Sequence, residues 1–163
     1  MALKRLVLFL LLTTFYLNLS AQNYSVGIGF YPTGAEAGFG LRTSKNSRFF
    51  ADIRVTKANL YKNPTSGSFI NEASAVFRIV QYQKVELHLG LGARTEWNFT
   101  PNQLNRYGFI APFGVEAFPF PFQNAGLFFE TGIYSTFASD KSFNFGLRSV
   151  AGFVFYFIKK EKV

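Results

Sequence analysis

The sequence has no cysteine among its 163 residues. This absence excludes disulfide bonds, thiolate metal sites and a lipid anchor on an N-terminal cysteine. The longest apolar run, residues 6–17, has about a dozen residues, whereas a membrane-spanning helix needs ~20. Histidine occurs once, at His88, so imidazole chemistry has a single candidate. The chain also has no basic helix and no aromatic platform for bases, and we expect no nucleic-acid partner.

The N-terminus has the layout of a secretory signal peptide. Lys4 and Arg5 form a positive end, the apolar run 6–17 follows, and residues 19–21 provide a small-residue exit. We expect a signal peptide over residues 1–21, cleaved before Gln22, and a mature domain over residues 22–163. A permanent membrane helix is the less favoured interpretation, because the apolar run is too short to span a bilayer.

Eight stretches of two-residue alternation fill the mature domain. Side chains of a strand point alternately to opposite sides, so the alternation sorts them into two faces. The stretches are 24–30, 35–42, 49–56, 70–80, 85–97, 108–119, 126–135 and 143–158. One face is almost purely apolar. The other face carries every charged or imidazole side chain of these stretches, namely Glu36, Arg42, Asp52, Arg54, Glu72, Arg78, Glu86, His88, Arg94, Glu96, Glu116, Glu130 and Arg148.

A soluble barrel with an apolar core would show the same alternation, so other features must decide which face is inside. Twelve of the 14 glycines lie on the polar face, and near the axis of a narrow barrel glycine makes room for long side chains. The five cations of this face are all arginine, the residue suited to fixed, water-poor ion pairs. The apolar face ends in Phe153, Phe155 and Phe157, an aromatic ladder that suits lipid. We therefore place the polar face inside.

These patterns predict an all-β fold, an eight-stranded antiparallel up-and-down transmembrane β-barrel. The mature chain of 142 residues (163 minus 21) supplies the ~9 to 11 residues that each outer-membrane strand needs and leaves no room for a second domain. Short connections are typical of periplasmic turns and longer ones of outer loops. The short connections are 43–48, 81–84 and 120–125, and the longer ones are 57–69, 98–107 and 136–142. Both mature termini are therefore expected in the periplasm.

Two local features depart from this scheme. The first outer loop, residues 31–34, is unusually tight for its side of the barrel. Pro112 lies in the middle of a predicted strand, where its missing N–H would interrupt the ladder. We expect either a bulge at Pro112 or a division of the segment into two short pieces.

The alternation and the aromatic final strand resemble the small eight-stranded outer-membrane barrels of the OmpA transmembrane-domain and OmpX type. The resemblance covers the whole mature chain and rests on architecture. It implies a porin-like protein of the outer membrane of a Gram-negative cell. The final strand, with its last aromatic at Phe157, resembles the signal recognised by the barrel-assembly machinery, a partner during insertion. The junction between Ala21 and Gln22 resembles signal cleavage sites common in Bacteroidota.

The charges of the polar face suggest a closed lumen. An eight-stranded barrel is only wide enough to be filled by side chains, and buried charges are costly unless they are paired. Seven acids against five arginines and His88 predict a structural ion-pair network and a non-conducting barrel. Arg94 has Glu96 two residues on, with Glu72 and Glu116 as candidates on adjacent strands. A narrow ion pore is a second hypothesis, which the lumen glycines keep open.

An enzyme is a third hypothesis, because some barrels of this size modify lipid A with a serine, a histidine and an acid. His88 would have to be the base, and no serine lies near it on the same face. A histidine among carboxylates and arginines is more often a member of an ion-pair network. We therefore expect no enzymatic activity, no cofactor and no metal site.

A fourth hypothesis is a module that interacts with lipid or with another protein. Outside the lumen, ten cations of the mature chain stand against two acids. Four outer-loop cations are expected to contact lipopolysaccharide phosphates: Lys57, Lys62, Arg106 and Lys141. A periplasmic or outer-membrane protein partner is compatible with the same charges. Aromatic residues at the strand ends are expected to form interface girdles: Tyr24, Tyr31, Tyr61, Tyr82, Trp97, Tyr107 and residues 118–122.

Overall fold

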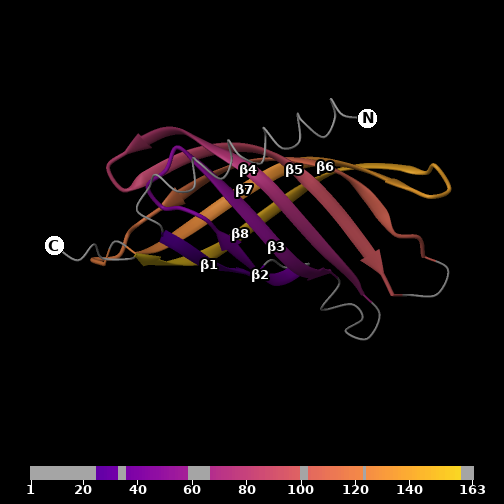
Figure 1. Ribbon diagram of the computed structural model, residues 1–163, viewed down its shortest axis with the longest axis horizontal. Helices are drawn as coiled ribbons and strands as arrows, with labels where there is room; N and C mark the ends of the chain where they lie inside the picture. The colour runs from indigo at the N-terminus through magenta and orange to yellow at the C-terminus, as the bar shows by residue number, and fades with distance from the viewer. Residues whose placement is uncertain (1–24, 33–35, 59–66, 100–102, 123, 159–163) are drawn as a thin grey trace, which may run out of the picture.

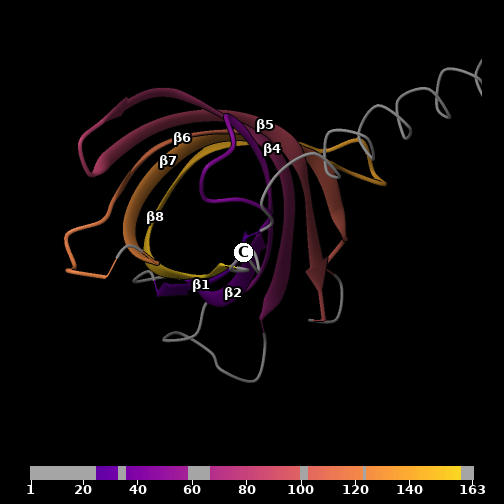
Figure 2. The same ribbon diagram turned by 60° about the vertical axis from the view of Figure 1, so that its left-hand side comes forward.

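Eight antiparallel strands close into a barrel in the computed structural model (Figure 1). Each strand pairs with the strands before and after it in the sequence, and β8 returns to β1, which closes the ring (Figure 2). This confirms the predicted fold class. The strands are β1 (Ser25–Pro32), β2 (Glu36–Arg42), β3 (Phe49–Ala58), β4 (Ser68–Tyr82), β5 (Val85–Asn98), β6 (Arg106–Ala117), β7 (Ala125–Ala138) and β8 (Phe143–Ile158).

The structure describes residues 25–32, 36–58, 67–99, 103–122 and 124–158. The predicted signal peptide, Tyr24, Tyr61, Lys62 and the basic tail 159–163 lie outside these ranges. Within these ranges, no helix is long and apolar enough to cross a membrane.

Apolar side chains cover the outside of the barrel, and charged side chains fill the lumen. Leu89, Phe129 and Leu147 are exposed on the outer surface, whereas Arg42 and Glu130 are completely buried. Buried and exposed residues alternate strictly along β1, as the period of a strand requires. This polarity is the reverse of that of a water-soluble barrel.

The strands are staggered around the barrel, and the wall is not equally tall on all sides. Register pairs followed once around the ring from Phe143 of β8 lead back to Phe153 of the same strand, a stagger of ten residues. A closed barrel needs such a stagger because its strands tilt. β1 has 8 residues and β2 has 7, but β8 has 16. The β7–β8 hairpin therefore extends beyond the β1–β2 hairpin (Figure 1).

Several strands are longer than the alternation predicted. β1 continues through Tyr31 to Pro32, β4 begins at Ser68 and β7 continues to Ala138. The connections at this end of the barrel shrink accordingly, because hairpin strands go on pairing their backbone groups beyond the apolar band. β6 is an exception, since it ends at Ala117 and leaves Phe118 in the connection to β7.

Pro112 lies inside β6 without a bulge or a break, so neither predicted alternative occurs. It pairs in register with Gly132 of β7. The ladder to β5 skips two residue pairs at this level and resumes in the same register. The proline is buried beside Gly90, where a Cβ would come within 3.0 Å of Pro112 Cγ. The absent side chain of Gly90 thus accommodates the ring. A bulge occurs instead in β4, between Arg78 and Val80.

Candidate functional site in the lumen

Glycines line the lumen where large side chains lie against the wall. A Cβ at Gly27 would come within 2.7 Å of the Tyr156 ring, and one at Gly146 within 2.6 Å of the Tyr134 hydroxyl. Positions of this kind cannot carry a larger residue unless the ring moves. The glycine-rich face therefore provides the space that the long lumen side chains occupy.

Arginines and acids alternate in the centre of the lumen. Arg54 Nη2 lies 2.6 Å from Asp52 Oδ2, and Arg54 Nη1 lies 2.6 Å from Glu130 Oε1. Arg42 Nε lies 2.9 Å from Asp52 Oδ2, and Arg148 Nη2 lies 2.7 Å from Glu130 Oε1. All five side chains are buried. Each charge faces an opposite charge, which is the condition under which buried charges are tolerated.

His88 is a member of this central cluster. Its Nε2 lies 3.2 Å from Glu130 Oε2, and its ring packs edge-on against Phe50 with 6.0 Å between the ring centres. Among the residues that the structure describes, the polar partner of His88 is thus a carboxylate and not a serine hydroxyl. The nucleophile and base of an acyl-transfer enzyme are not brought together here.

A second cluster lies toward the end of the barrel where β1 ends and β8 begins. Arg94 Nη1 lies 2.6 Å from Glu72 Oε1, and Arg94 Nη2 lies 2.9 Å from Glu96 Oε1. Arg148 Nη2 lies 3.2 Å from Glu72 Oε2 and connects this cluster to the centre. Glu116 does not reach Arg94, because the register places Arg94 opposite Gly108 and not near Glu116. Of the three candidate partners of Arg94, Glu72 and Glu96 are therefore in contact with it and Glu116 is not. The predicted lumen residue Glu36 is half-buried at this end and accepts a hydrogen bond from Thr56 Oγ1 at 3.3 Å.

A third cluster lies at the terminal end, where β1 begins and β8 ends. Arg42 Nη1 lies 2.9 Å from Glu116 Oε2, and the Tyr156 hydroxyl donates to Glu116 Oε1 at 2.9 Å. Arg78 Nε lies 2.5 Å from Glu86 Oε2. Arg42 therefore connects this cluster to Asp52 in the centre. Through these contacts the five lumen arginines each face at least one carboxylate.

The connection 43–48, here the 43–48 loop, crosses the opening at the terminal end (Figure 2). The guanidinium of Arg78 donates to the carbonyl of Ser47 and, at 2.9 Å, to the carbonyl of Ser44. The backbone N–H of Lys45 donates to Ser25 Oγ at 2.7 Å, and its ammonium lies 4.5 Å from the centre of the Phe118 ring. Partial burial lowers the pKa of the Lys45 ammonium, against the attraction of nearby carboxylates.

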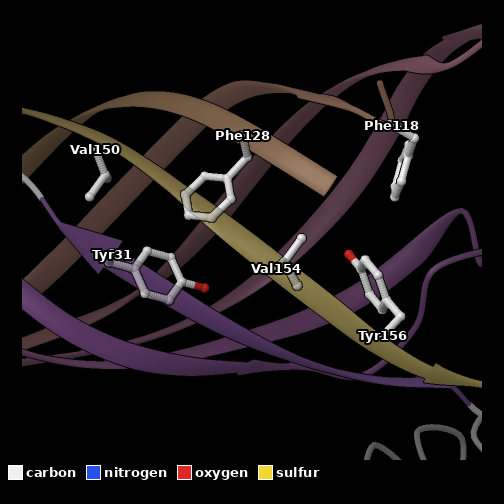
Figure 3. Packing of buried hydrophobic residues seen from close by; sticks show 6 residues of the cluster. All are labelled: Tyr31, Phe118, Phe128, Val150, Val154 and Tyr156. Atoms are coloured by element: carbon white, nitrogen blue, oxygen red, sulfur yellow. The ribbon is translucent and has the colours of Figure 1, made fainter. Parts of the chain in front are cut away.

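An apolar cluster, which the sequence did not predict, lies inside the barrel (Figure 3). Its members are Tyr31, Phe118, Phe128, Val150, Val154 and Tyr156. The prediction that Tyr31 and Phe118 belong to interface girdles is wrong, because both side chains are buried inside the barrel. Strand parity carries the signal: Tyr31 continues the lumen face of Gly27 and Gly29, and Phe118 continues that of Glu116. The predicted girdle residues Tyr82, Trp97, Tyr107 and Phe122 are exposed.

Of the cations predicted to lie in outer loops, some lie in strands and one lies in a connection between strands. Lys57 lies in β3 and Arg106 begins β6, whereas Lys141 lies in the β7–β8 connection with a φ of 66° and is exposed. Arg106 Nη2 donates to the Ser142 carbonyl at 3.2 Å. Lys62 is outside the described residues. Only Lys141 of these three therefore extends from a connection.

The lumen is built to hold charges in fixed positions. Arg42 with Glu116 joins β2 to β6, and Arg54 with Glu130 joins β3 to β7, so pairs cross the lumen as well as follow its wall. No group of three or more histidines and acids among the described residues is arranged to hold a metal ion. The arrangement connects distant strands and neutralises charge.

No protein-family model matches the sequence, and no curated protein matches it. Among solved structures, the chain is similar to the N-terminal β-barrel domain of Pseudomonas aeruginosa OprF. The TM-score is 0.56 at 12% sequence identity, over 83% of this chain and 98% of that chain. At this identity the likeness shows the fold alone. It supports the resemblance to OmpA-type barrels at the level of architecture.

Proposed function

We propose that the mature chain is an integral β-barrel protein of the outer membrane, with both mature termini in the periplasm. The observation that carries this proposal is the inverted polarity of the barrel, apolar outside and charged inside. An apolar surface of this extent is matched to lipid and not to water. The predicted signal peptide over residues 1–21 supports export, and the aromatic end of β8 supports insertion by the barrel-assembly machinery.

We infer a non-conducting barrel. The side chains of Arg54 and Glu130 meet across the lumen, and the rings of Tyr31 and Phe128 lie beside them with 4.9 Å between the ring centres. An interior of eight strands has little space beyond what such side chains fill. The ion pairs then serve to hold the strands together and to leave no charge uncompensated.

A barrel with a closed lumen can bind other molecules at its outer wall and at its two ends. We therefore propose a structural role or an interaction with lipid or a partner protein, and not an enzymatic one. Lys141 is exposed in the β7–β8 connection, where it would contact lipopolysaccharide phosphates. The sequence predicts the same contact for Lys62. Such contacts are ones that lysine makes readily.

Lipid-phase labelling of single cysteines tests the membrane location, and the natural chain contributes no cysteine of its own. In liposomes, Leu89→Cys and Phe129→Cys should react with a lipid-soluble maleimide, because both side chains are on the outer surface. Ser74→Cys should not react, because Ser74 is buried in the lumen. The reverse pattern would show that the barrel is water-soluble.

Planar-bilayer recordings test the closed lumen, and we expect no single-channel conductance from the purified barrel. Steady conductance would instead favour the narrow pore. The mass spectrum of lipid A should be identical in cells with the wild-type chain, with His88→Ala and without the protein. A change that depends on His88 would revive the enzyme hypothesis.

A further inference from the structure

The edge of β8 that faces β1 is paired over only part of its length. Residues 153–158 of β8 pair with residues 25–30 of β1, and β1 ends at Pro32. On its other side, β8 pairs with β7 from Phe143 to Phe155. Among the described residues, the stretch 143–149 therefore has a partner strand on one side only. We call this stretch the open edge.

The backbone direction shows which groups the open edge presents. The N–H of Tyr156 donates to the Asn124 carbonyl on the β7 side. Successive N–H groups of a strand point to opposite sides, so even-numbered residues of β8 bond toward β7 and odd-numbered ones toward β1. Phe143, Phe145, Leu147 and Ser149 therefore direct their N–H and C=O groups to the open edge.

The same residues carry the apolar outer surface. Leu147 is 75% exposed and Phe145 is 61% exposed. β1 and β2, with 8 and 7 residues, are shorter than the ~9 to 11 residues that a membrane-spanning strand needs. Because Phe145 and Leu147 are exposed apolar residues, the open edge lies at the level of the apolar outer surface. The β7–β8 hairpin that carries it extends beyond the β1–β2 hairpin (Figure 1).

Unpaired backbone groups are costly in hydrocarbon, and open sheet edges do not occur there. This step rests on the proposed membrane location. We propose that the open edge docks an extended strand of a partner protein, antiparallel to β8, in the place where a longer β1 would lie. The partner strand would present apolar side chains to lipid beside Phe145 and Leu147.

The inner face of the open edge adds a requirement to the partner strand. Arg148 lies on this face, is buried, and its Nε has no hydrogen-bond partner among the described residues. An acidic or amide side chain on the inner face of the partner strand would supply an acceptor. The partner strand is thus apolar on one face and carries an acceptor on the other.

A second copy of this chain fits the open edge less well. Copies inserted in the same orientation are related by an axis along the membrane normal, so their β8 strands would both point to the same side of the membrane. Such strands can pair only in the parallel manner, which is the less stable one.

A peptide copy of the natural partner of β8 tests the docking. The probe is the sequence of residues 131–138 with cysteine in place of Thr131, which lies opposite Ser149 in the β7–β8 register, and glutamate in place of Gly132, which lies opposite Arg148. The peptide is supplied as a mixed disulfide with thiopyridine, so that the thiolate of the detergent-folded Ser149→Cys barrel displaces thiopyridone and forms a disulfide with the peptide. Leu89→Cys is the matched control, since Leu89 is exposed on a strand that is paired on both sides. We expect at least a tenfold higher yield for Ser149→Cys, equivalent to about 1.4 kcal/mol of pairing. Equal yields would overturn the proposal.

Two proline substitutions separate docking on the open edge from exchange with β7. Leu147→Pro removes an N–H that points to the open edge, and Gly146→Pro removes one that points to β7. Proline is tolerated on a free edge and not in a paired one. Leu147→Pro in the Ser149→Cys background should fold, as judged by heat-modifiable gel migration, and should lose the disulfide. Gly146→Pro should not fold, because it removes an N–H paired with β7 and because its ring would also meet the Tyr134 hydroxyl.

The outcomes also separate the docking site from the membrane location. Two results for Leu147→Pro would overturn the open-edge proposal. One is a failure to fold, like that expected for Gly146→Pro, and the other is an undiminished disulfide yield. Self-association of the wild-type barrel that Leu147→Pro abolishes would overturn it in favour of a second copy. Failure of the Leu89→Cys labelling in liposomes would overturn the membrane location. The disulfide yield with the peptide would still decide whether the open edge binds a strand.

Discussion

The buried arginines of the lumen differ in the number of carboxylates that each one contacts. Arg78 faces one carboxylate, whereas Arg54 and Arg94 each face two. Removal of an arginine between two acids leaves both acids buried without a counter-charge. Removal of a complete pair can instead be nearly neutral, because the desolvation cost of both charges disappears as well. The lumen network therefore allows tests in which a second substitution repairs the first.

Arg94→Met should lower the free energy of unfolding of the detergent-folded barrel by about 3–5 kcal/mol, the usual cost of breaking a buried pair. Arg94→Met with Glu72→Met should lower it less, because Glu72 is the nearest partner of Arg94 at 2.6 Å. Urea unfolding followed by the fluorescence of Trp97, the single tryptophan, measures both effects.

Glu116→Met supplies the control for this pair. Glu116 binds Arg42 and not Arg94, so its combination with Arg94→Met should be less stable than Arg94→Met alone. If both double variants behaved alike, the charges would be solvated individually and the lumen network would not be structural.

Asp140 in the β7–β8 connection is a titratable residue outside the barrel wall. The hydrogen bonds of Ser142 lower the pKa of this carboxyl below its usual value of 3.8. Because the folded-state pKa lies below the unfolded one, the carboxylate stabilises the turn above the unfolded pKa and loses this effect as the pH falls through the folded pKa. Ser142→Ala should raise the pKa toward 3.8, which an NMR titration of the Asp140 carboxyl carbon would detect. An unchanged pKa would mean that the backbone N–H of residue 142 is the sufficient donor.

One lumen side chain, that of Arg78, helps to hold the 43–48 loop in place. Arg78 holds two of its carbonyls and pairs with Glu86. Arg78→Met with Glu86→Met removes these hydrogen bonds without leaving a buried charge, and each bond to a charged group contributes about 1.5–3 kcal/mol. The loop should then open more often, and the lysine-specific protease Lys-C should cut after Lys45 at least about tenfold faster. Cleavage after Lys84, in the β4–β5 turn, should not change.

At the scale of strands, alternation predicted the fold class and the face of most residues, because burial on one side imposes a period of two. It indicated Glu72, Glu96 and Glu116 as candidate partners of Arg94 but could not tell that Glu116 is not in contact with it, since parity says which face a residue takes and nothing about which residue lies opposite. It also missed the inward positions of Tyr31 and Phe118. Both lie at strand ends, where an aromatic ring suits the interface as well as the lumen, and only the boundary of the strand decides between them.

The alternation already indicated unequal strand lengths, with the short stretch 24–30 and the long stretch 143–158, but not the open edge that follows from them. The short β1–β2 hairpin is visible in the sequence as the tight connection 31–34, but the consequence for β8 depends on the stagger of ten residues around the ring. A stagger is a property of the closed barrel as a whole. No single strand carries a signal for it.

For the whole molecule, the polarity of the wall predicts how it responds to a new charge. Leu89→Arg places a cation on the outer surface, where the cost at mid-membrane is about 2–4 kcal/mol, so folding into liposomes should fail or become weak. Thr56→Arg places the same group in the lumen beside Glu36 and should be milder. Folding yield into liposomes, read from gel migration, compares the two. Equal effects would contradict the assignment of the faces.

The ion pairs that cross the lumen also determine the order of events when the barrel folds. Arg42 meets a carboxylate 74 residues further along the chain, and Arg54 meets one 76 residues further. Contacts between such distant residues form late. Asp52 of β3 contacts both guanidinium groups, but each group also faces a carboxylate from β6 or β7. Until those strands pair, water must hydrate the remaining N–H groups, so the incomplete barrel holds water in its lumen. Water leaves when the last strands bring the missing carboxylates, and an unfinished barrel is therefore marked by the water it still holds.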